Sequence, residues 1–113
     1  MNSGAIPRFI GELEDRGGLK GTDIANITDV SKATVSRWRS GTTKPHPRNE
    51  LILSDLHYIA GRLSDYYNAS EIRTWLYARH PQLDGHRAID LIYEDRSIEI
   101  LRIIDRLDAE AYL

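Results

Sequence analysis

Small polar and basic residues gather between positions 31 and 44 of the chain. At helical spacing, most of them would share the solvent-facing side of one helix over residues 32–40. Guanidinium, ammonium and hydroxyl groups in this arrangement can contact base edges and phosphates in a DNA major groove. The candidate DNA-binding residues are Ser31, Lys32, Thr34, Ser36, Arg37, Arg39 and Lys44.

The segment around these residues has the pattern of a helix-turn-helix. We expect a short helix over 23–27, a tight turn over 28–30 and a second helix over 32–40. Ser31 is a favourable N-cap for the second helix, and Gly41 is suited to end it.

The apolar residues of this segment have the spacing that two closely crossing helices need. Ala25 is small at the expected crossing, and Val35 and Trp38 would pack the second helix onto the first. The pattern resembles helix-turn-helix regulators of the Xre, or phage-repressor-like, type. Asp29 stands where such turns often have glycine, because the backbone there is left-handed, and its negative charge opposes DNA binding. The alternative is a packing or dimerisation unit without a role on DNA.

The second half of the chain has the pattern of a helical protein-binding unit. Its main features are Trp75-Leu76, then Pro81, then the Leu-Asp-Gly-His-Arg-Ala-Ile-Asp-Leu-Ile segment at 83–92, and finally residues 101–113. Following the helix-turn-helix in this order, the pattern resembles the Xre/MbcA/ParS antitoxin family.

The resemblance implies a partner, a RES-domain toxin that degrades NAD and is encoded beside the antitoxin. It also implies that C-terminal residues block the substrate pocket of that toxin. By position, these would be Arg106, Asp108, Ala109, Glu110, Ala111, Tyr112 and Leu113. The chain departs from the family pattern at Ala88, where proline is usual, and at Glu110, where glycine is common.

Alternatives remain open for the C-terminal residues and for the whole chain. Tyr112 and Leu113 could instead cover the core of their own chain as the last turn of a helix. As a whole, the chain could be a stand-alone transcription regulator with a dimerising second half, or an adaptor whose helix-turn-helix no longer binds DNA. A homodimer is expected if DNA is the ligand, because a single helix-turn-helix makes few contacts with DNA.

The distribution of charge predicts two regions with different partners. The 113 residues have a net charge of −2, yet residues 1–48 hold eight Lys and Arg against five Asp and Glu, and residues 49–113 hold seven against twelve. Together with the resemblance, this asymmetry divides the chain into an expected DNA-binding region, 1–47, and an expected toxin-binding region, 48–113.

Several other classes of function find no support in the sequence. Cysteine is absent, and His46, His57, His80 and His86 do not have the spacing of metal ligands, so no metal site is expected. No nucleophile stands beside a base and no glycine-rich phosphate loop occurs, so neither an enzyme, a cofactor nor a small-molecule substrate is predicted. Without a signal peptide or a membrane-spanning run, a soluble cytoplasmic protein is expected.

Helical periodicity elsewhere predicts an all-α fold. We expect helices from Pro7 to the Gly17-Gly18 pair, over 48–67, from a Ser70 cap to the His80-Pro81 pair, over 88–93 and from 97 to about 107. In the last helix, Ile98, Leu101 and Ile104 are predicted to face the core, with Ile103 beside them.

Overall fold

The computed structural model describes residues 5–111 and confirms the all-α fold class. No β-strand occurs among these residues, where Arg79 and Arg87 form an isolated antiparallel bridge. The helices of the described chain are α1 (Ala5–Asp15), α2 (Gly21–Thr28), α3 (Lys32–Ser40), α4 (Pro47–Leu63), α5 (Ala69–Tyr77), the short 3-10 helix η1 (Pro81–Leu83), α6 (Ala88–Tyr93) and α7 (Ser97–Ala111).

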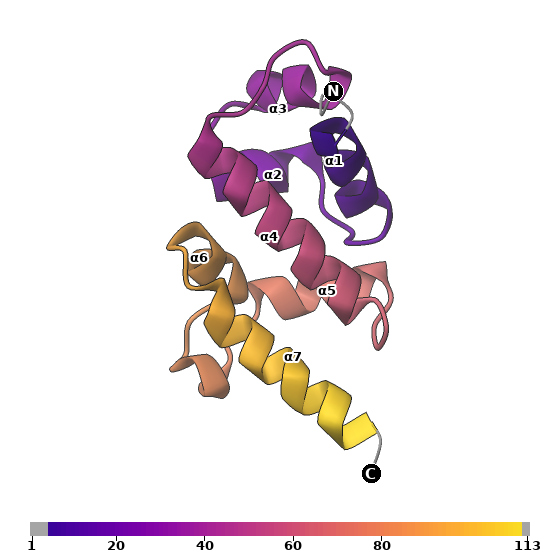
Figure 1. Ribbon diagram of the computed structural model, residues 1–113, viewed down its shortest axis with the longest axis vertical. Coiled ribbons are helices and arrows are strands. Elements are labelled where there is room, and N and C mark those ends of the chain that lie inside the picture. The colour runs from indigo at the N-terminus through magenta and orange to yellow at the C-terminus, as the bar shows by residue number, and fades with distance from the viewer. Residues whose placement is uncertain (1–4, 112–113) are drawn as a thin grey trace.

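The molecule is elongated, with extents of 46 × 25 × 24 Å. Helix α3 lies at one end of the long axis, and the C-terminal end of α7 lies at the other (Figure 1). Helix α4 runs between the two ends and contacts α1 and α2 as well as α6 and α7. No helix in residues 5–111 is long and apolar enough to cross a bilayer.

Helix α4 is the scaffold that its periodicity predicts. Pro47 occupies its first turn, where the missing N–H costs nothing, and Leu53, Leu56 and Leu63 are fully buried along it. The helix ends at Leu63 instead of near Tyr67. Residues from both predicted regions join the same buried cluster around α4, and the functional division at residue 47 stays a prediction.

Helices α2 and α3 and the turn between them lie where the sequence predicts them. The Ser31 hydroxyl accepts a hydrogen bond from the backbone N–H of Thr34 at 3.1 Å, which confirms the predicted cap. Asp29 has φ 58° and ψ 49°, the left-handed conformation expected at this turn, and Gly41 ends α3 with φ 77°. Val35 and Trp38 are both buried.

The expected start of α5 is wrong by two residues. Asn68, and not Ser70, caps the helix: its side chain accepts from the Glu71 N–H at 2.9 Å, and the Glu71 carboxylate accepts from the Asn68 N–H at 3.0 Å. These two reciprocal hydrogen bonds satisfy two backbone N–H groups at the start of the helix. The exposed Ser70 side chain does not cap either of them. The helix also ends earlier than expected, at Tyr77.

The predicted orientation of α7 is partly wrong. Ile98 has 58% of its surface exposed, while Ile100 and Ile104 are fully buried and Leu101 and Ile103 are half-buried. The Ser97 hydroxyl donates to the Asp55 carboxylate on α4 at 3.0 Å and faces inward in the place expected for Ile98. The helix also continues to Ala111, beyond the expected end near Leu107.

Candidate functional site

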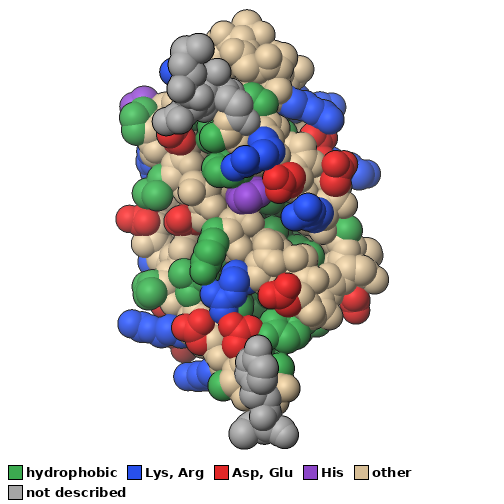
Figure 2. Space-filling view, turned by 45° about the vertical axis from the view of Figure 1, so that its right-hand side comes forward, with side chains coloured by type: hydrophobic (Ala, Val, Ile, Leu, Met, Phe, Trp, Pro, Cys, Tyr) green, Lys and Arg blue, Asp and Glu red, His purple; other side chains and the backbone are tan. Residues whose placement is uncertain are grey.

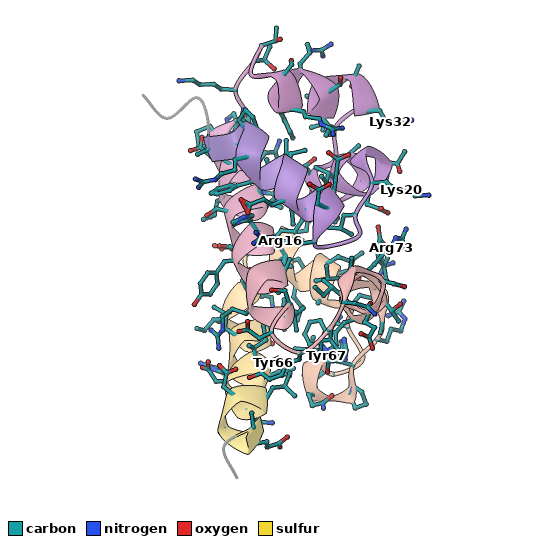
Figure 3. All side chains as sticks on the ribbon, turned by 90° about the vertical axis from the view of Figure 1, so that its right-hand side faces the viewer. Arg16, Lys20, Lys32, Tyr66, Tyr67 and Arg73 are labelled. Carbon is teal, nitrogen blue, oxygen red and sulfur yellow. The ribbon has the colours of Figure 1, made fainter. Side chains whose placement is uncertain are left out.

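The predicted DNA-binding residues of α3 lie on one open surface at the end of the molecule. Ser31, Lys32, Ser36 and Arg37 are exposed, and Thr34 is half-buried. The Arg37 guanidinium donates to the Thr34 hydroxyl at 3.2 Å. Figure 3 shows Lys32 at this end of the molecule, far from Tyr66. The surface is therefore accessible to a large ligand.

Two further predicted DNA-binding residues flank this surface. Lys44 is exposed in the loop after α3. Arg39 forms an ion pair with Glu14 of α1, with 3.0 Å between its Nη1 and the Glu14 carboxylate. The other Glu14 carboxylate oxygen is buried and has no hydrogen-bond partner among the described residues. Arg39 thus already has an anionic partner within the chain, which a phosphate would have to replace.

The predicted toxin-binding residues belong to the last two turns of α7. Arg106, Ala109, Glu110 and Ala111 are exposed. Tyr112 and Leu113, also predicted as contacts, lie outside the described residues. Up to Ala111, the predicted contact segment is therefore an ordered helix whose exposed side chains are Arg106, Ala109, Glu110 and Ala111.

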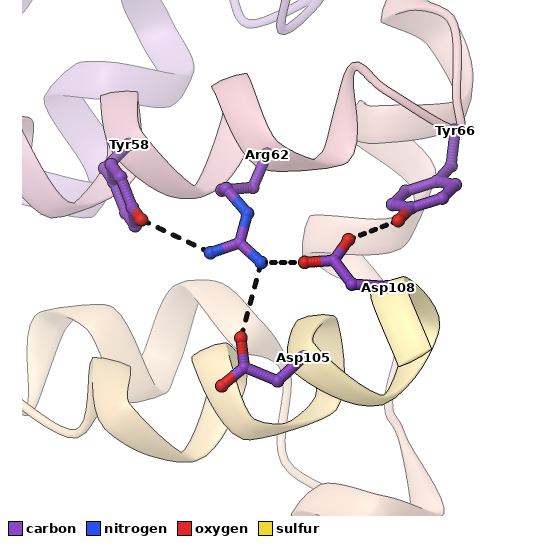
Figure 4. Close-up of polar contacts among 5 residues, drawn as sticks. All are labelled: Tyr58, Arg62, Tyr66, Asp105 and Asp108. Carbon is purple, nitrogen blue, oxygen red and sulfur yellow. Dashed lines mark hydrogen bonds and ion pairs between the residues drawn. The ribbon is translucent and has the colours of Figure 1, made fainter. Parts of the chain in front are cut away.

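Asp108 differs from the other predicted contact residues because it faces α4. One of its carboxylate oxygens pairs with the Arg62 guanidinium, and the other accepts a hydrogen bond from the Tyr66 hydroxyl (Figure 4). The hydrogen bond from Tyr66, together with that from Arg62, lowers the pKa of Asp108 below its usual value. Asp108 is therefore held as an anion within its own chain.

Arg62 is the centre of this group. It donates to the Tyr58 hydroxyl at 3.2 Å and lies 3.3 Å from the Asp105 carboxylate. The contact with Tyr58, followed by those with Asp108 and Asp105, raises the pKa of Arg62 above its usual value. Periodicity could not reveal this group, since Arg62 and Asp108 are 46 residues apart.

A second polar group, also missed by the sequence, joins α2 to α5. The Asp23 carboxylate is buried, with 5% of the residue exposed, and accepts from the Lys20 backbone N–H at 2.8 Å. It also accepts from Arg73 at 3.0 Å and from the Tyr77 hydroxyl at 2.5 Å. Burial, and then the contact with Asp23, raises the pKa of Tyr77 to about 12. The group connects the predicted helix-turn-helix to the second half of the chain.

Elsewhere, several titratable side chains pair with one another near the surface. Within residues 5–111, no group of three His, Asp or Glu side chains could hold a metal ion. His57 lies 3.1 Å from the Glu12 carboxylate and stacks on Phe9. Acidic and basic side chains are interspersed on the face shown in Figure 2, and no large area of one sign appears there.

Several hollows open on the surface of the described residues. One of about 410 Å³ lies between α2 and α6, and its lining includes Asn26, Tyr77 and Arg87. The Arg87 guanidinium is engaged by Asp90 on the same rim, with both carboxylate oxygens within 3.0 Å. The Tyr77 hydroxyl in this lining is likewise engaged, since it donates to Asp23 at 2.5 Å.

Comparison with known proteins identifies similar chains in mycobacteria. No family model matches. The mycobacterial cidal antitoxin MbcA of Mycobacterium tuberculosis, and likewise that of Mycobacterium bovis, is 27% identical over 105 residues, covering 93% of this chain and 86% of the relative. A probable mycobacterial cidal antitoxin of M. tuberculosis is 29% identical over 96 residues, covering 85% of this chain and 82% of the relative.

A solved structure has the same fold. A chain in the crystal structure of the M. tuberculosis MbcT–MbcA toxin–antitoxin complex superposes with a TM-score of 0.83 and 24% identity, covering 96% of this chain and 97% of that one. The arrangement of helices described above is thus shared with a chain of a toxin–antitoxin complex.

Proposed function

We propose that this chain, a homologue of the mycobacterial cidal antitoxins over most of its length, is itself an antitoxin. It binds a RES-domain toxin encoded beside it and blocks the active site of that toxin with its C-terminal residues. It also represses the shared operon by binding operator DNA through α3. The observation that carries the proposal is similarity across nearly the whole of both chains, which includes the C-terminal half as well as the more widespread helix-turn-helix pattern.

The positions of the two candidate surfaces support two simultaneous partners. The exposed side of α3 and the C-terminal end of α7 lie at opposite ends of a molecule 46 Å long (Figure 1). A toxin seated on the end of α7 therefore leaves α3 accessible to DNA. Neutralisation and repression are then separable by mutation.

Neutralisation of this kind is steric and requires no catalytic residue in the antitoxin. The end of α7 projects exposed Arg106, Ala109 and Glu110, and the chain continues to Tyr112 and Leu113. An aromatic residue and a leucine suit insertion into a pocket, where buried apolar anchors dominate binding energy.

Repression requires α3 to enter a major groove. Lys32 and Arg37 supply positive charge, and Ser31 and Ser36 supply hydroxyl groups for base edges and phosphates. Because one copy makes few contacts, a homodimer or a larger toxin–antitoxin assembly on a palindromic site is the expected binding form.

Co-expression with the adjacent gene product tests the proposal. The neighbouring RES-domain protein should arrest growth when expressed alone, and this chain should restore growth and copurify with it. A neighbour that is not toxic, or one whose toxicity this chain does not relieve, would contradict the antitoxin function.

The open α3 surface also favours a second candidate, a stand-alone transcription regulator. That candidate predicts operator binding in the absence of any protein partner and no rescue in the co-expression experiment. An adaptor predicts the reverse, a bound partner and no affinity for DNA. Measuring both activities on one purified preparation distinguishes the three.

A further inference from the structure

The last turns of α7 have little apolar burial to hold them in place. Ile104 is the last fully buried residue of the described chain, and Leu107 is half-buried. A terminal segment with so few buried contacts normally frays. Here, polar contacts to α4 anchor the part of α7 that the apolar core does not hold.

These contacts form a clasp, which we define as Tyr58, Arg62, Tyr66, Asp105 and Asp108. The Arg62 guanidinium reaches both acidic residues of α7, and the Tyr66 hydroxyl reaches Asp108 from the turn that follows α4 (Figure 4). Both carboxylate oxygens of Asp108 are therefore engaged. The Tyr58 hydroxyl accepts from Arg62 and orients the guanidinium between the helices.

The clasp determines which side of α7 is available to a partner. Residues three and four apart share one side of a helix, so Asp105 and Asp108 together face α4. By the same rule Arg106 and Glu110 form another side, with Ala109 between the two sides, and all three residues are exposed. Fixing the first side fixes the orientation of the second.

We propose that Arg62 and Tyr66 are positioning residues for toxin binding. Through Asp108, they hold the end of α7 as an ordered helix that presents Arg106, Ala109 and Glu110 to the toxin. Asp108 then acts by anchoring the helix and does not touch the toxin. The inference rests on the proposed antitoxin function and assigns a role in it to residues of α4 and the following turn, outside the predicted contact segment.

The physical advantage is preorganisation. A disordered C-terminal segment must lose backbone and side-chain freedom when it binds, which weakens the complex. A segment already ordered by the clasp loses less. Breaking the clasp should therefore weaken toxin binding even though every group that contacts the toxin remains present.

A double-mutant cycle on the full chain tests this role. Affinity for the neighbouring RES-domain protein is measured for Arg62→Gln, Asp108→Asn and the double variant, together with hydrogen exchange of the backbone amides over 106–111. The matched control is Arg102→Gln, which removes an exposed cation of α7 that forms no ion pair within the described residues.

Each single variant should weaken toxin binding about tenfold. The double variant should also be about tenfold weaker, instead of about a hundredfold, because both residues act through the same contact. Amide exchange over 106–111 should accelerate in all three, melting temperature should change little, and Arg102→Gln should behave as the parent chain.

Two results would overturn the inference, and a third would overturn the proposed function on which it rests. Unchanged affinity in the single variants would show that the clasp does not position the segment. Additive losses would show that Asp108 and Arg62 act independently, as direct toxin contacts do. If the parent chain itself fails to bind the toxin, the proposed function fails, and the exchange data then report separately on whether the clasp orders α7.

Discussion

The Tyr77 hydroxyl of α5 lies 2.5 Å from the buried carboxylate of Asp23 in the first turn of α2. Arg73, one helical turn before Tyr77, reaches the same carboxylate oxygen at 3.0 Å. The carboxylate thus caps its own helix through Lys20 and joins two helices from different halves of the chain. This contact joins the two halves in addition to the packing of buried side chains around α4.

The raised pKa of Tyr77 predicts alkaline sensitivity. The folded-state pKa is about 12, above the value of about 10 in an unfolded chain. Folding therefore favours the neutral phenol, and the stability due to Tyr77 is complete below about pH 10 and is lost as pH rises towards 12. Urea unfolding between pH 9 and 12 should show a decline that is smaller in Tyr77→Phe; equal declines in both proteins would contradict the assignment.

Replacing Arg37 with alanine should weaken operator binding and spare toxin neutralisation. If Arg37 contacts a phosphate, its loss should reduce the slope of log affinity against log salt by about one. Fluorescence anisotropy over a range of salt concentrations measures this slope. A variant that loses both DNA binding and neutralisation would indicate misfolding and would argue against two separable surfaces.

Replacing Glu14 with glutamine should strengthen DNA binding. The substitution removes the carboxylate that pairs with Arg39 and frees this guanidinium for a phosphate. We expect binding about two- to threefold tighter at low salt, with the gain disappearing at high salt, where screening is strong. Asp65→Asn makes the same change in net charge in the turn after α4, next to Tyr66, which lies far from Lys32 of α3 (Figure 3). An equal gain in this control would attribute the effect to net charge alone.

The orientation of α7 can be tested through its isoleucines. Ile100→Ala removes a fully buried side chain and should lower the free energy of unfolding by about 3 kcal/mol. Ile98→Ala removes an exposed one and should cost less than about 1 kcal/mol. Chemical denaturation of both variants gives the comparison, and a larger loss for Ile98→Ala would favour the orientation expected from sequence.

Local signals made most of the helices predictable. Ser31, Asp29 and Gly41 each specify a cap or a turn through their own chemistry, and all three act as expected. The start of α5 was predictable as well, because Asn68 and Glu71 have the spacing of a capping box. The prediction placed the N-cap at Ser70, two residues too far along the chain.

What the sequence could not reveal depends on contacts between distant residues. The isoleucines of α7 are so closely spaced that the sequence is compatible with more than one side of the helix facing the core. In the structure, the side that carries Ser97 faces inward, and the Ser97 hydroxyl donates a hydrogen bond to Asp55 on α4. The Asp23 group and the clasp likewise join residues 42 to 54 positions apart. Periodicity describes one element at a time and contains no information on such pairs.

Inhibition of NAD consumption tests the central claim most directly. The purified RES-domain neighbour should consume NAD, and adding the full chain should stop this at a stoichiometric ratio, while a chain lacking residues 109–113 should remain folded by circular dichroism and inhibit little. Full inhibition by the shortened chain would contradict blocking by the C-terminal residues. A neighbour that consumes NAD equally with and without the full chain would contradict the antitoxin function itself.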